Sequence, residues 1–244
     1  MRILVINPNT TTSMTEKISE AANNAAASYT QIIAVNPIDG PVSIEGYYDE
    51  AYCVPGLLSE IRKGELNKID AHIIACFDDT GLEAARSLAR APVIGIGEAA
   101  FHVASLLGHR FSVITTLSRS IAAIENNLMK YGLASRCARV RASDIPVLEL
   151  EDPTSQAYVQ ISEQIELAKR VDQAEVIVLG CAGMADLAHR LSIQHSIPVI
   201  DGVAAAVKLA EGLCALGLKT SKLGAYATPL PKAYKGQFGH AAPD

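Results

Sequence analysis

Residues 69–79 read IDAHIIACFDD, and residues 174–184 read AEVIVLGCAGM. Each stretch has an acidic residue near its start, continues as an apolar run of strand length, and reaches a cysteine, Cys76 or Cys181, where that run ends. After a helical stretch, a second apolar run follows a proline, Pro92 or Pro198, which stands 16 or 17 residues beyond the cysteine. We therefore predict an internal duplication that places one thiol at the same point of each half.

The alternation of apolar runs and helical stretches extends over the whole chain. Runs of strand length occupy residues 3–6, 31–35, 71–75, 93–96, 111–115, 138–142, 175–179, 199–200 and 223–226. Apolar residues recur at helical spacing in 12–27, 49–64, 81–89, 98–107, 118–131, 153–171, 185–194 and 203–216. This order is typical of an α/β fold with parallel sheets. Together with the duplication, it predicts two pseudo-symmetric lobes, residues 1–97 with 210–244 and residues 98–209.

Composition argues against several classes of protein. Of the 244 residues, 49% are hydrophobic and 19% are charged, so the chain has enough apolar material for a sizeable core. A net charge of −5 without a cluster of Lys and Arg argues against nucleic acid as a partner. No apolar run approaches the roughly 20 residues of a membrane span, so we expect no membrane partner either.

The N-terminus and the cysteines predict a location. The chain enters an apolar run directly after Met1-Arg2 and lacks the features of a secretory signal. Its five cysteines are odd in number and lack the spacing of a disulfide framework. We therefore expect a cytoplasmic protein with reduced thiols.

Four polar or thiol-bearing loops follow predicted strands. Because ligands of open α/β sheets bind beyond the carboxyl ends of the strands, we expect these loops to converge. They are Asn7-Pro8-Asn9-Thr10, Cys76-Phe77-Asp78-Asp79, Thr115-Thr116 and Cys181-Ala182-Gly183. The polar residues have structural alternatives. The asparagines suit a turn as well as a binding loop, and the two aspartates suit helix capping as well as general-base chemistry. Thr115 and Thr116 are equally ambiguous.

The paired cysteines give a more specific functional hypothesis than the polar residues of the loops. A lone cysteine is usually a small buried hydrophobic residue, and we assign that role to Cys53, Cys137 and Cys214. Cys76 and Cys181 instead stand at equivalent strand ends before helical stretches. A helix N-terminus there is expected to lower a thiol pKa and to hold a developing oxyanion. Two facing thiols can remove a proton from one side of a carbon and return one to the other, which is the chemistry of a cofactor-independent racemase.

Two further patterns do not support a cofactor. Residues 95–100 read GIGEAA and match a loose dinucleotide fingerprint, but they follow the fourth strand, and the acidic residue expected about 20 residues later is absent. The six histidines show no metal-ligand spacing, and no C-x-x-C motif occurs. We expect no metal and no cofactor.

At these residues the chain resembles the hydantoin racemase family, which is closely related to allantoin racemases, within the aspartate/glutamate racemase superfamily. The matching motifs are INPNT at 6–10, PVSIEG at 41–46, ACFDD at 75–79, GEAA at 97–100, VITT at 113–116 and LGCAGM at 179–184. Glutamate racemases have a Thr-His pair after the second cysteine, where this chain has Ala182-Gly183. That departure argues for a neutral pocket suited to a ring amide.

The resemblance implies a site between two α/β lobes, with Cys76 and Cys181 as acid and base and without pyridoxal phosphate or metal. It implies a hydantoin-type ring as the small-molecule substrate. The substrate-binding residues that it implies are Asn7, Pro8, Asn9, Ser43, Ile44, Phe77, Asp78, Thr115, Thr116, Gly180, Ala182 and Gly183. Separately, Ala-rich helices and a chain of this size permit a dimer, tetramer or hexamer, so we expect a homo-oligomer.

Other functions remain open from the sequence. An allantoin racemase would use the same chemistry, and a polar lining near Ile44 would favour it over 5-substituted hydantoins. A decarboxylase or a maleate-type isomerase of the superfamily is a rival in another reaction class, although arylmalonate decarboxylases commonly keep one cysteine. A non-catalytic binding module is the third alternative, which low reactivity of both thiols would support.

Overall fold

The structure is a computed structural model that describes residues 1–151 and 155–243. Two parallel four-stranded sheets organise the molecule. The first sheet has the order β2-β1-β3-β4 and the second the order β6-β5-β7-β8. The strands are β1 (Arg2–Ile6), β2 (Gln31–Val35), β3 (Ala71–Ile74), β4 (Val93–Gly95), β5 (Phe111–Thr115), β6 (Cys137–Ala142), β7 (Val176–Gly180) and β8 (Val199–Ile200). Every neighbouring pair is parallel. The sheets therefore repeat one topology, in which β3 and β7 are equivalent.

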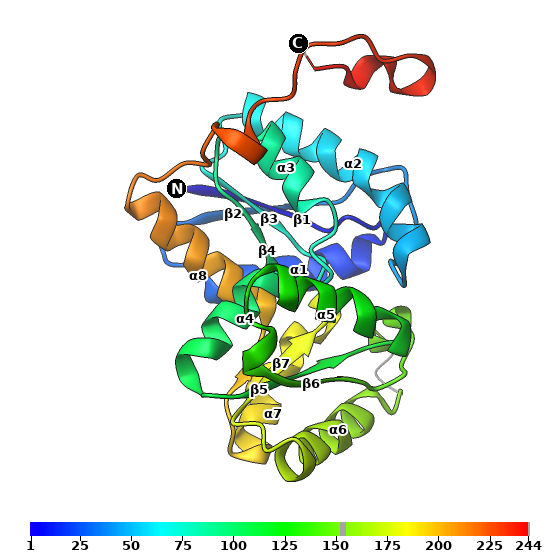
Figure 1. Cartoon of the computed structure of the whole chain (residues 1–244), viewed down its shortest axis with the longest axis vertical. Coiled ribbons are helices and arrows are strands. Elements are labelled where there is room, and N and C mark those ends of the chain that lie inside the picture. The colour runs from blue at the N-terminus through cyan, green and yellow to red at the C-terminus, as the bar shows by residue number, and fades with distance from the viewer. Residues whose placement is uncertain (152–154, 244) are drawn as a thin grey trace.

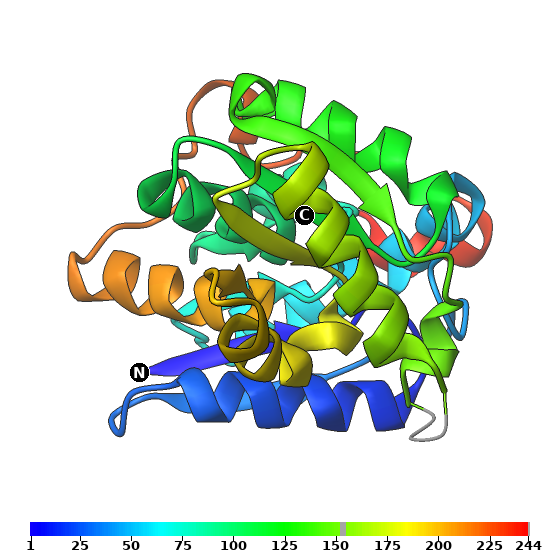
Figure 2. The ribbon, with the colours of Figure 1, turned by 90° about the horizontal axis from the view of Figure 1, so that it is seen from below.

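Helices cover both faces of each sheet (Figure 1). The helices are α1 (Thr12–Ala25), α2 (Tyr47–Leu66), α3 (Leu82–Leu88), α4 (Ile96–Leu107), α5 (Ile121–Lys130), α6 (Ala157–Val171), α7 (Ala188–His195) and α8 (Gly202–Ala215). In the first lobe, α2 and α3 lie on the outer face and α1 and α8 on the inner face. In the second lobe, α6 and α7 lie on the outer face, toward the viewer of Figure 2, and α4 and α5 on the inner face.

The strands are apolar throughout because both faces of each sheet are covered. β3, β5 and β7 are buried along their whole length. One core cluster joins the lobes, since it contains Ile73 of the first sheet and Val178 of the second. At its centre Phe101 of α4 meets Phe77 edge to face, with ring centroids 5.3 Å apart, and stacks on Phe111 at 6.0 Å. Side chains from both lobes thus share one interior.

The prediction of an α/β fold with two parallel-sheet lobes is confirmed, and the eight strands lie where the apolar runs indicate. The prediction of a strand at 223–226 is wrong. Gly224 has φ +67, which interrupts an extended chain, and Gly224–Tyr226 form a short 3-10 helix. The ammonium group of Lys222 stabilises this turn by donating to the carbonyl oxygens of Arg86 and Tyr226.

Some helices begin at other residues than predicted, and the predicted lobe boundaries stay predictions. The predicted helices at 118–131 and 185–194 begin with 3-10 segments, Ser118–Ser120 and Ala182–Leu187, before α5 and α7. Residues 153–154 of the predicted helix at 153–171 lie outside the described residues, and α6 starts at Ala157. The lobe boundaries at 97/98 and 209/210 stay predictions. Within the described ranges, no helix combines the length and apolarity needed to cross a membrane.

Candidate active site

A small cavity of about 40 Å³ lies where the carboxyl edges of the two sheets meet. Both cysteines of the duplicated segments line it. Its lining residues are Asn7, Pro8, Asn9, Met14, Ile44, Ala75, Cys76, Phe77, Asp78, Thr115, Thr116, Ser120, Val147, Gly180, Cys181 and Ala182. The strand-end loops of both lobes therefore converge on one space.

Most of the residues singled out in the sequence are brought together here. Ser43 and Gly183 do not line the cavity, although a Cβ built on Gly183 would lie 3.7 Å from Sγ of Cys181. Sequence reasoning missed Met14, Ala75, Ser120 and Val147. Ala75 directly follows β3 and could have been found by the same rule, whereas Ser120 lies in the 3-10 segment before α5, and Met14 and Val147 carry no chemical signal.

The Asn7-Pro8-Asn9 loop is held mainly by its own side chains. Asn7 Nδ2 donates to Asn9 Oδ1 at 2.8 Å and to Thr15 Oγ1 at 3.0 Å. Asn9 Oδ1 also accepts from the Thr11 amide at 2.9 Å, and Asn9 Nδ2 contacts Met14 Sδ at 3.1 Å. Both asparagines are almost fully buried. The turn alternative therefore accounts for most of their polar groups, and the loop is a rigid wall of the cavity.

Cys76 lies in a turn rather than at the start of a helix. α3 begins only at Leu82, and the Asp79 amide donates to the Cys76 carbonyl at 3.1 Å. The hydroxyl of Thr80 lies 3.6 Å from Sγ. Burial, with a smaller contribution from the Asp78 carboxylate, raises the thiol pKa well above its ordinary value, and the Thr80 hydroxyl offsets part of that rise.

Cys181 directly precedes the 3-10 helix Ala182–Leu187. The Gly183 amide hydrogen-bonds the sulfur and, with the more distant Lys17 ammonium, lowers the thiol pKa. Burial outweighs both and raises that pKa to about 11. The expectation that a helix N-terminus lowers both thiol pKa values is therefore wrong, because desolvation of the thiolates is the larger effect.

The two aspartates have different roles. Asp79 is buried, and its carboxylate accepts from the amides of Gly97 at 3.0 Å and Glu98 at 2.8 Å and from the Tyr131 hydroxyl at 2.8 Å. It therefore caps α4, a helix distant in sequence. Of the two roles open from the sequence, Asp79 has the helix-capping one. A Cβ at Gly95 or Gly97 would overlap Asp79 or the Phe77 carbonyl. The glycines of the GIGEAA motif thus make room for this cap.

Asp78 faces the cavity instead. Its backbone carbonyl accepts from Asn127 Nδ2 at 2.7 Å, but its carboxyl group has no hydrogen-bond partner within the described part of the chain. Burial, and then the nearby Glu50 and Asp79, raise the pKa of Asp78 to about 7. Its negative charge raises the pKa of both thiols. The cavity therefore contains one unpaired carboxyl group whose charge acts on both cysteines.

The two threonines also differ. Thr115 Oγ1 donates to the Gly180 carbonyl at 3.1 Å and joins the ends of β5 and β7. A Cβ at Gly180 would lie 2.9 Å from that of Thr115, so only glycine fits there. Thr116 is buried at the cavity wall, and its hydroxyl has no partner among the residues that the structure describes. Thr116 is thus the threonine whose hydroxyl is available to a ligand.

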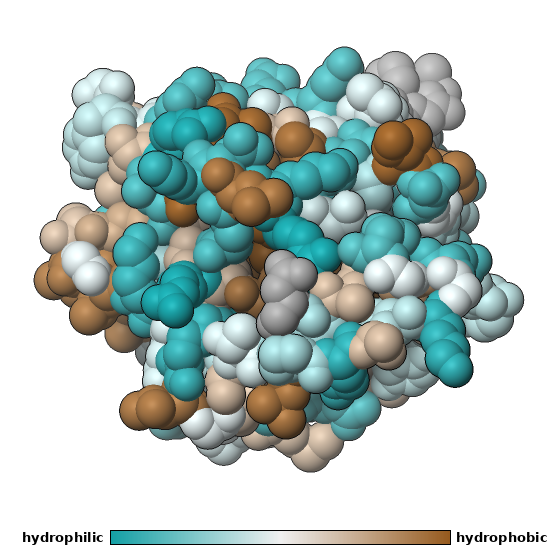
Figure 3. All heavy atoms as spheres, turned by 90° about the horizontal axis from the view of Figure 1, so that it is seen from above, coloured by the Kyte–Doolittle hydropathy of each residue, from teal (hydrophilic) through white to brown (hydrophobic). Residues whose placement is uncertain are grey.

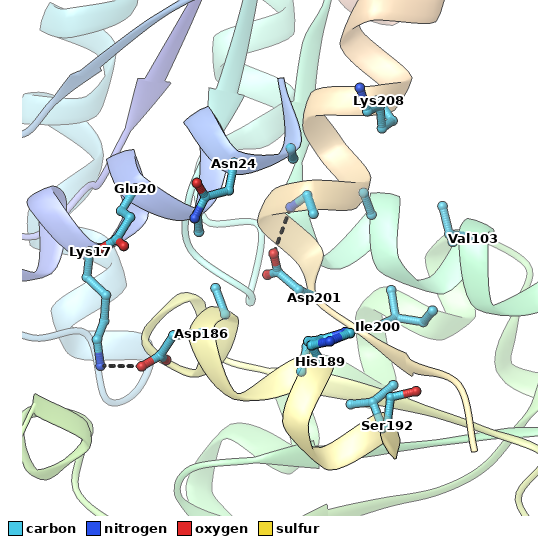
Figure 4. Close-up of a pocket in the computed structure, with 17 residues that line it drawn as sticks. Lys17, Glu20, Asn24, Val103, Asp186, His189, Ser192, Ile200, Asp201 and Lys208 are labelled. Carbon is cyan, nitrogen blue, oxygen red and sulfur yellow. Dashed lines mark hydrogen bonds and ion pairs between the residues drawn. The ribbon is translucent and has the colours of Figure 1, made fainter. Parts of the chain in front are cut away.

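Charge distinguishes this cavity from a larger one. No Lys, Arg or His stands among the described residues that line it, so an anionic ligand would meet no cation. A second cavity of about 700 Å³ lies between α1, α7 and α8 (Figure 4). There Lys17 pairs with Asp186 at 3.5 Å, and Asp201 caps α8. The described residues that line that groove include no cysteine, and much of its charge is paired. The small cavity is therefore the candidate active site.

Comparison with known proteins shows the family of the chain. The Asp/Glu/Hydantoin racemase family model matches residues 3–210. A hydantoin racemase of Rhizobium meliloti is 52% identical over 97% of this chain and 98% of its own. The solved allantoin racemase from Klebsiella pneumoniae has a TM-score of 0.97 and 49% identity, covering 100% of both chains. An arylmalonate decarboxylase, with a TM-score of 0.60 and 16% identity over 93% of this chain and 97% of its own, shares the fold alone.

The two-lobed α/β fold with its cleft between parallel sheets thus defines the architecture shared by racemases of this superfamily. The chain belongs to the Asp/Glu/hydantoin racemase family. It is therefore a racemase, an enzyme of the isomerase class.

Proposed function

We propose that this enzyme racemises 5-monosubstituted hydantoins at the C5 carbon without a cofactor, with Cys76 and Cys181 as the acid and base. One observation carries the proposal: thiols from equivalent loops of the two lobes line a single cavity that has no cationic side chain among the described residues of its lining. The similarity to the Rhizobium meliloti hydantoin racemase supports the substrate class.

In the proposed mechanism one cysteine is a thiolate and the other a thiol. The thiolate removes the C5 proton, and the electron pair of the C–H bond moves onto the C4 carbonyl to form a planar enolate. The opposite thiol then protonates C5 from the other face and becomes the thiolate. A thiol whose pKa is about 11, as for Cys181, is a strong base once it is deprotonated, which suits a weak carbon acid.

The substrate ring is proposed to bind through groups that the protein leaves unpaired. The Asp78 carboxyl group would accept a hydrogen bond from a ring N–H, and the Thr116 hydroxyl would donate to the enolate oxygen. Thr115 does not suit this role because its hydroxyl already donates to Gly180.

A second candidate substrate is allantoin, whose hydantoin ring carries a ureido group at C5. The 49% identity to the Klebsiella pneumoniae allantoin racemase favours it. Against it, the cavity lining includes the apolar side chains of Ile44, Met14, Phe77 and Val147, which suit an apolar substituent. A decarboxylase would hold a carboxylate substrate, for which the described lining offers no cation.

We also propose that the enzyme is a cytoplasmic homo-oligomer. All five of its cysteines are free, which suits a reducing compartment. A small-molecule substrate remains the proposed ligand.

The test follows an L-5-substituted hydantoin in heavy water by optical rotation and by the C5 proton signal. We expect rotation to disappear as deuterium enters C5, and Cys76→Ser and Cys181→Ser each to stop racemisation. Cys214→Ser is the matched control, since Cys214 donates only to the Asp70 carbonyl and does not line the cavity. Racemisation of allantoin alone would change the substrate and keep the mechanism. Normal racemisation by either serine variant would refute the two-thiol mechanism.

A further inference from the structure

The chain ends in an arm that leaves the body of the first lobe (Figure 1). We define the arm as residues 227–243. All of its residues are exposed except Pro229, Ala242 and Pro243, which are half-buried. It is attached through the Arg62 guanidinium of α2, which donates to the carbonyls of His240 at 3.2 Å and Ala242 at 2.9 Å. The arm is therefore tied to the body near its end while its side chains face outward.

The arm carries large apolar residues that its own chain leaves partly or mostly exposed. Leu230 is 76% exposed, Tyr234 43% and Phe238 42%. They recur at intervals of four residues. Apolar side chains gathered on a projecting segment are typical of a surface that a partner covers. Figure 3 views the molecule from the end at which the arm leaves and shows hydrophobic residues in separate groups among hydrophilic ones.

The arm also differs in charge from the rest of the chain. Residues 227–243 contain two lysines and no acidic residue, and Asp244 follows them, whereas the whole chain has 21 Lys and Arg against 26 Asp and Glu. Lys232 and Lys235 lie in the arm itself and are exposed. A basic segment on an acidic protein is attracted to the body of another copy.

An apolar face of matching character lies at the start of α2. We call it the tyrosine face: Val42, Tyr47, Tyr48 and Tyr52, which are 59% to 76% exposed. The rings of Tyr48 and Tyr52 pack with centroids 4.9 Å apart. Glu45 and Asp49 flank the face in sequence, with the Asp49 carboxylate bound to the Glu45 amide at 3.0 Å. Exposed aromatic rings beside carboxylates suit an arm of Leu, Tyr, Phe and Lys.

The positions of the two surfaces allow a reciprocal contact. Arg62, which ties the arm, and Tyr52 lie on the same helix, ten residues or about 15 Å apart. An arm of this length spans up to about 56 Å when extended. The match to the Klebsiella pneumoniae structure covers 100% of both chains at a TM-score of 0.97, so it extends over the arm.

We propose that the arm of one copy binds the tyrosine face of a second copy, and that the arm of the second copy binds the tyrosine face of the first across a twofold axis. Such an exchange is isologous, because each copy contributes the same arm and the same face. Leu230, Tyr234 and Phe238 are the apolar anchors, and Lys232 and Lys235 approach Glu45 and Asp49.

Molar mass in solution, measured by light scattering after gel filtration, tests the proposal. We expect the full chain to be at least dimeric. L230S/Y234S/F238S in the arm and Y48S/Y52S in the face should each lower the mass at least twofold while circular dichroism stays unchanged. T228S/Q237S is the matched control, since it alters two exposed polar residues of the arm and should leave the mass unchanged. A monomeric full chain, or unchanged mass in either serine variant, overturns the proposal.

A second measurement identifies which chain the arm touches. Unlabelled and nitrogen-15-labelled chains are refolded together and treated with a carbodiimide, which couples lysine to carboxylate without a spacer. The proposal predicts peptides of mixed isotope that join Lys232 or Lys235 to Glu45 or Asp49. Cross-links found only within one isotope would show that the arm lies on its own chain, and cross-links to other carboxylates would refute the tyrosine face.

Discussion

The loops of Cys76 and Cys181 occupy the same point of one duplicated topology, yet they surround their sulfurs differently. Cys76 lies in a turn beside the Thr80 hydroxyl, with the Asp78 charge as the strongest neighbour that opposes its thiolate. Cys181 precedes a 3-10 helix, receives the Gly183 amide, and has Lys17 as a distant cation that favours its thiolate. The two duplicated segments thus keep their cysteines at the same position, while the two thiols differ in proton affinity. We expect Cys181 to be the readier thiolate.

The largest effect should come from removing either sulfur. Cys76→Ser and Cys181→Ser are each expected to lower kcat for racemisation by about 10³-fold or more, because a serine hydroxyl is a far weaker acid than a thiol. The equilibrium constant of a racemisation is one, so kcat/KM stays equal for the two enantiomers in every active variant. Only exchange of the C5 proton without inversion can therefore separate the two cysteines.

The pH dependence of that exchange compares the two cysteine loops directly. Each serine variant should exchange the C5 proton of a single enantiomer with heavy water, and the two variants should choose opposite enantiomers. Exchange by Cys76→Ser, which keeps Cys181, should reach its maximum at lower pH than exchange by Cys181→Ser. Equal pH profiles would contradict the proposed difference in proton affinity.

Asp78→Asn should have the next largest effect on activity. It removes the negative charge that raises the pKa of both thiols, so the alkaline rise of the exchange rate should move to lower pH in both single-cysteine backgrounds. It also weakens an acceptor for the substrate N–H, and we expect kcat/KM to fall about 10-fold to 100-fold. An unchanged pH profile would show that Asp78 does not act on the thiols.

The same substitution tests stability against pH. The pKa of Asp78 rises from 3.8 to about 7 on folding, mainly through burial. The folded state therefore binds this proton more tightly than the unfolded state, and the associated stability is lost as pH rises from 3.8 through 7. Asp78→Asn should flatten that decline in the free energy of unfolding, measured by urea titration at several pH values. An equally steep decline in the variant would assign the effect to other groups.

Asp79→Ala should reduce stability more than it changes the chemistry. It removes the acceptor of the Gly97 and Glu98 amides and of the Tyr131 hydroxyl. We expect a loss of about 2–3 kcal/mol in the free energy of unfolding, the sum of a helix cap and a buried hydrogen bond. Denaturant titration measures it. A loss below that of an exposed-site control such as Glu163→Ala would contradict the capping role.

The smallest effect should come from Thr80→Val in the Cys181→Ser background, where only Cys76 remains. Loss of the hydroxyl 3.6 Å from Sγ removes one group that favours the thiolate, so the exchange profile should move to higher pH by a fraction of a unit. Thr116→Val in the same background is the comparison, because Thr116 lines the cavity but makes no hydrogen bond to Cys76 within the described residues. A shift of the same size in both variants would mean that the Thr80 contact is not specific.

Much of the fold follows from the sequence because buried parallel strands read as unbroken apolar runs. β2, β5 and β8 begin and end where those runs do. The cavity follows from a second rule, since loops at the carboxyl ends of parallel strands meet at one edge. That rule placed Asn7, Cys76, Thr116 and Cys181 together without any knowledge of distances.

The features that could not be predicted from the sequence depend on contacts between distant residues. Asp79 caps a helix that begins at Ile96, and nothing within its own loop indicates that partner. The thiol pKa values depend on burial, which local motifs do not reveal, so the expected helix effect was overestimated. Met14 and Val147 line the cavity with ordinary core side chains, which carry no pattern that separates them from the interior.

The aromatic stack at the lobe junction has a consequence for how the molecule unfolds. Phe77, Phe101 and Phe111 belong to one continuous core, so neither lobe can lose its packing without exposing rings that the other lobe covers. The duplicated halves should therefore melt in one cooperative transition rather than two. A chain cut between residues 97 and 98 would give fragments that need each other to fold, so the repeated unit is no longer an independent folding domain.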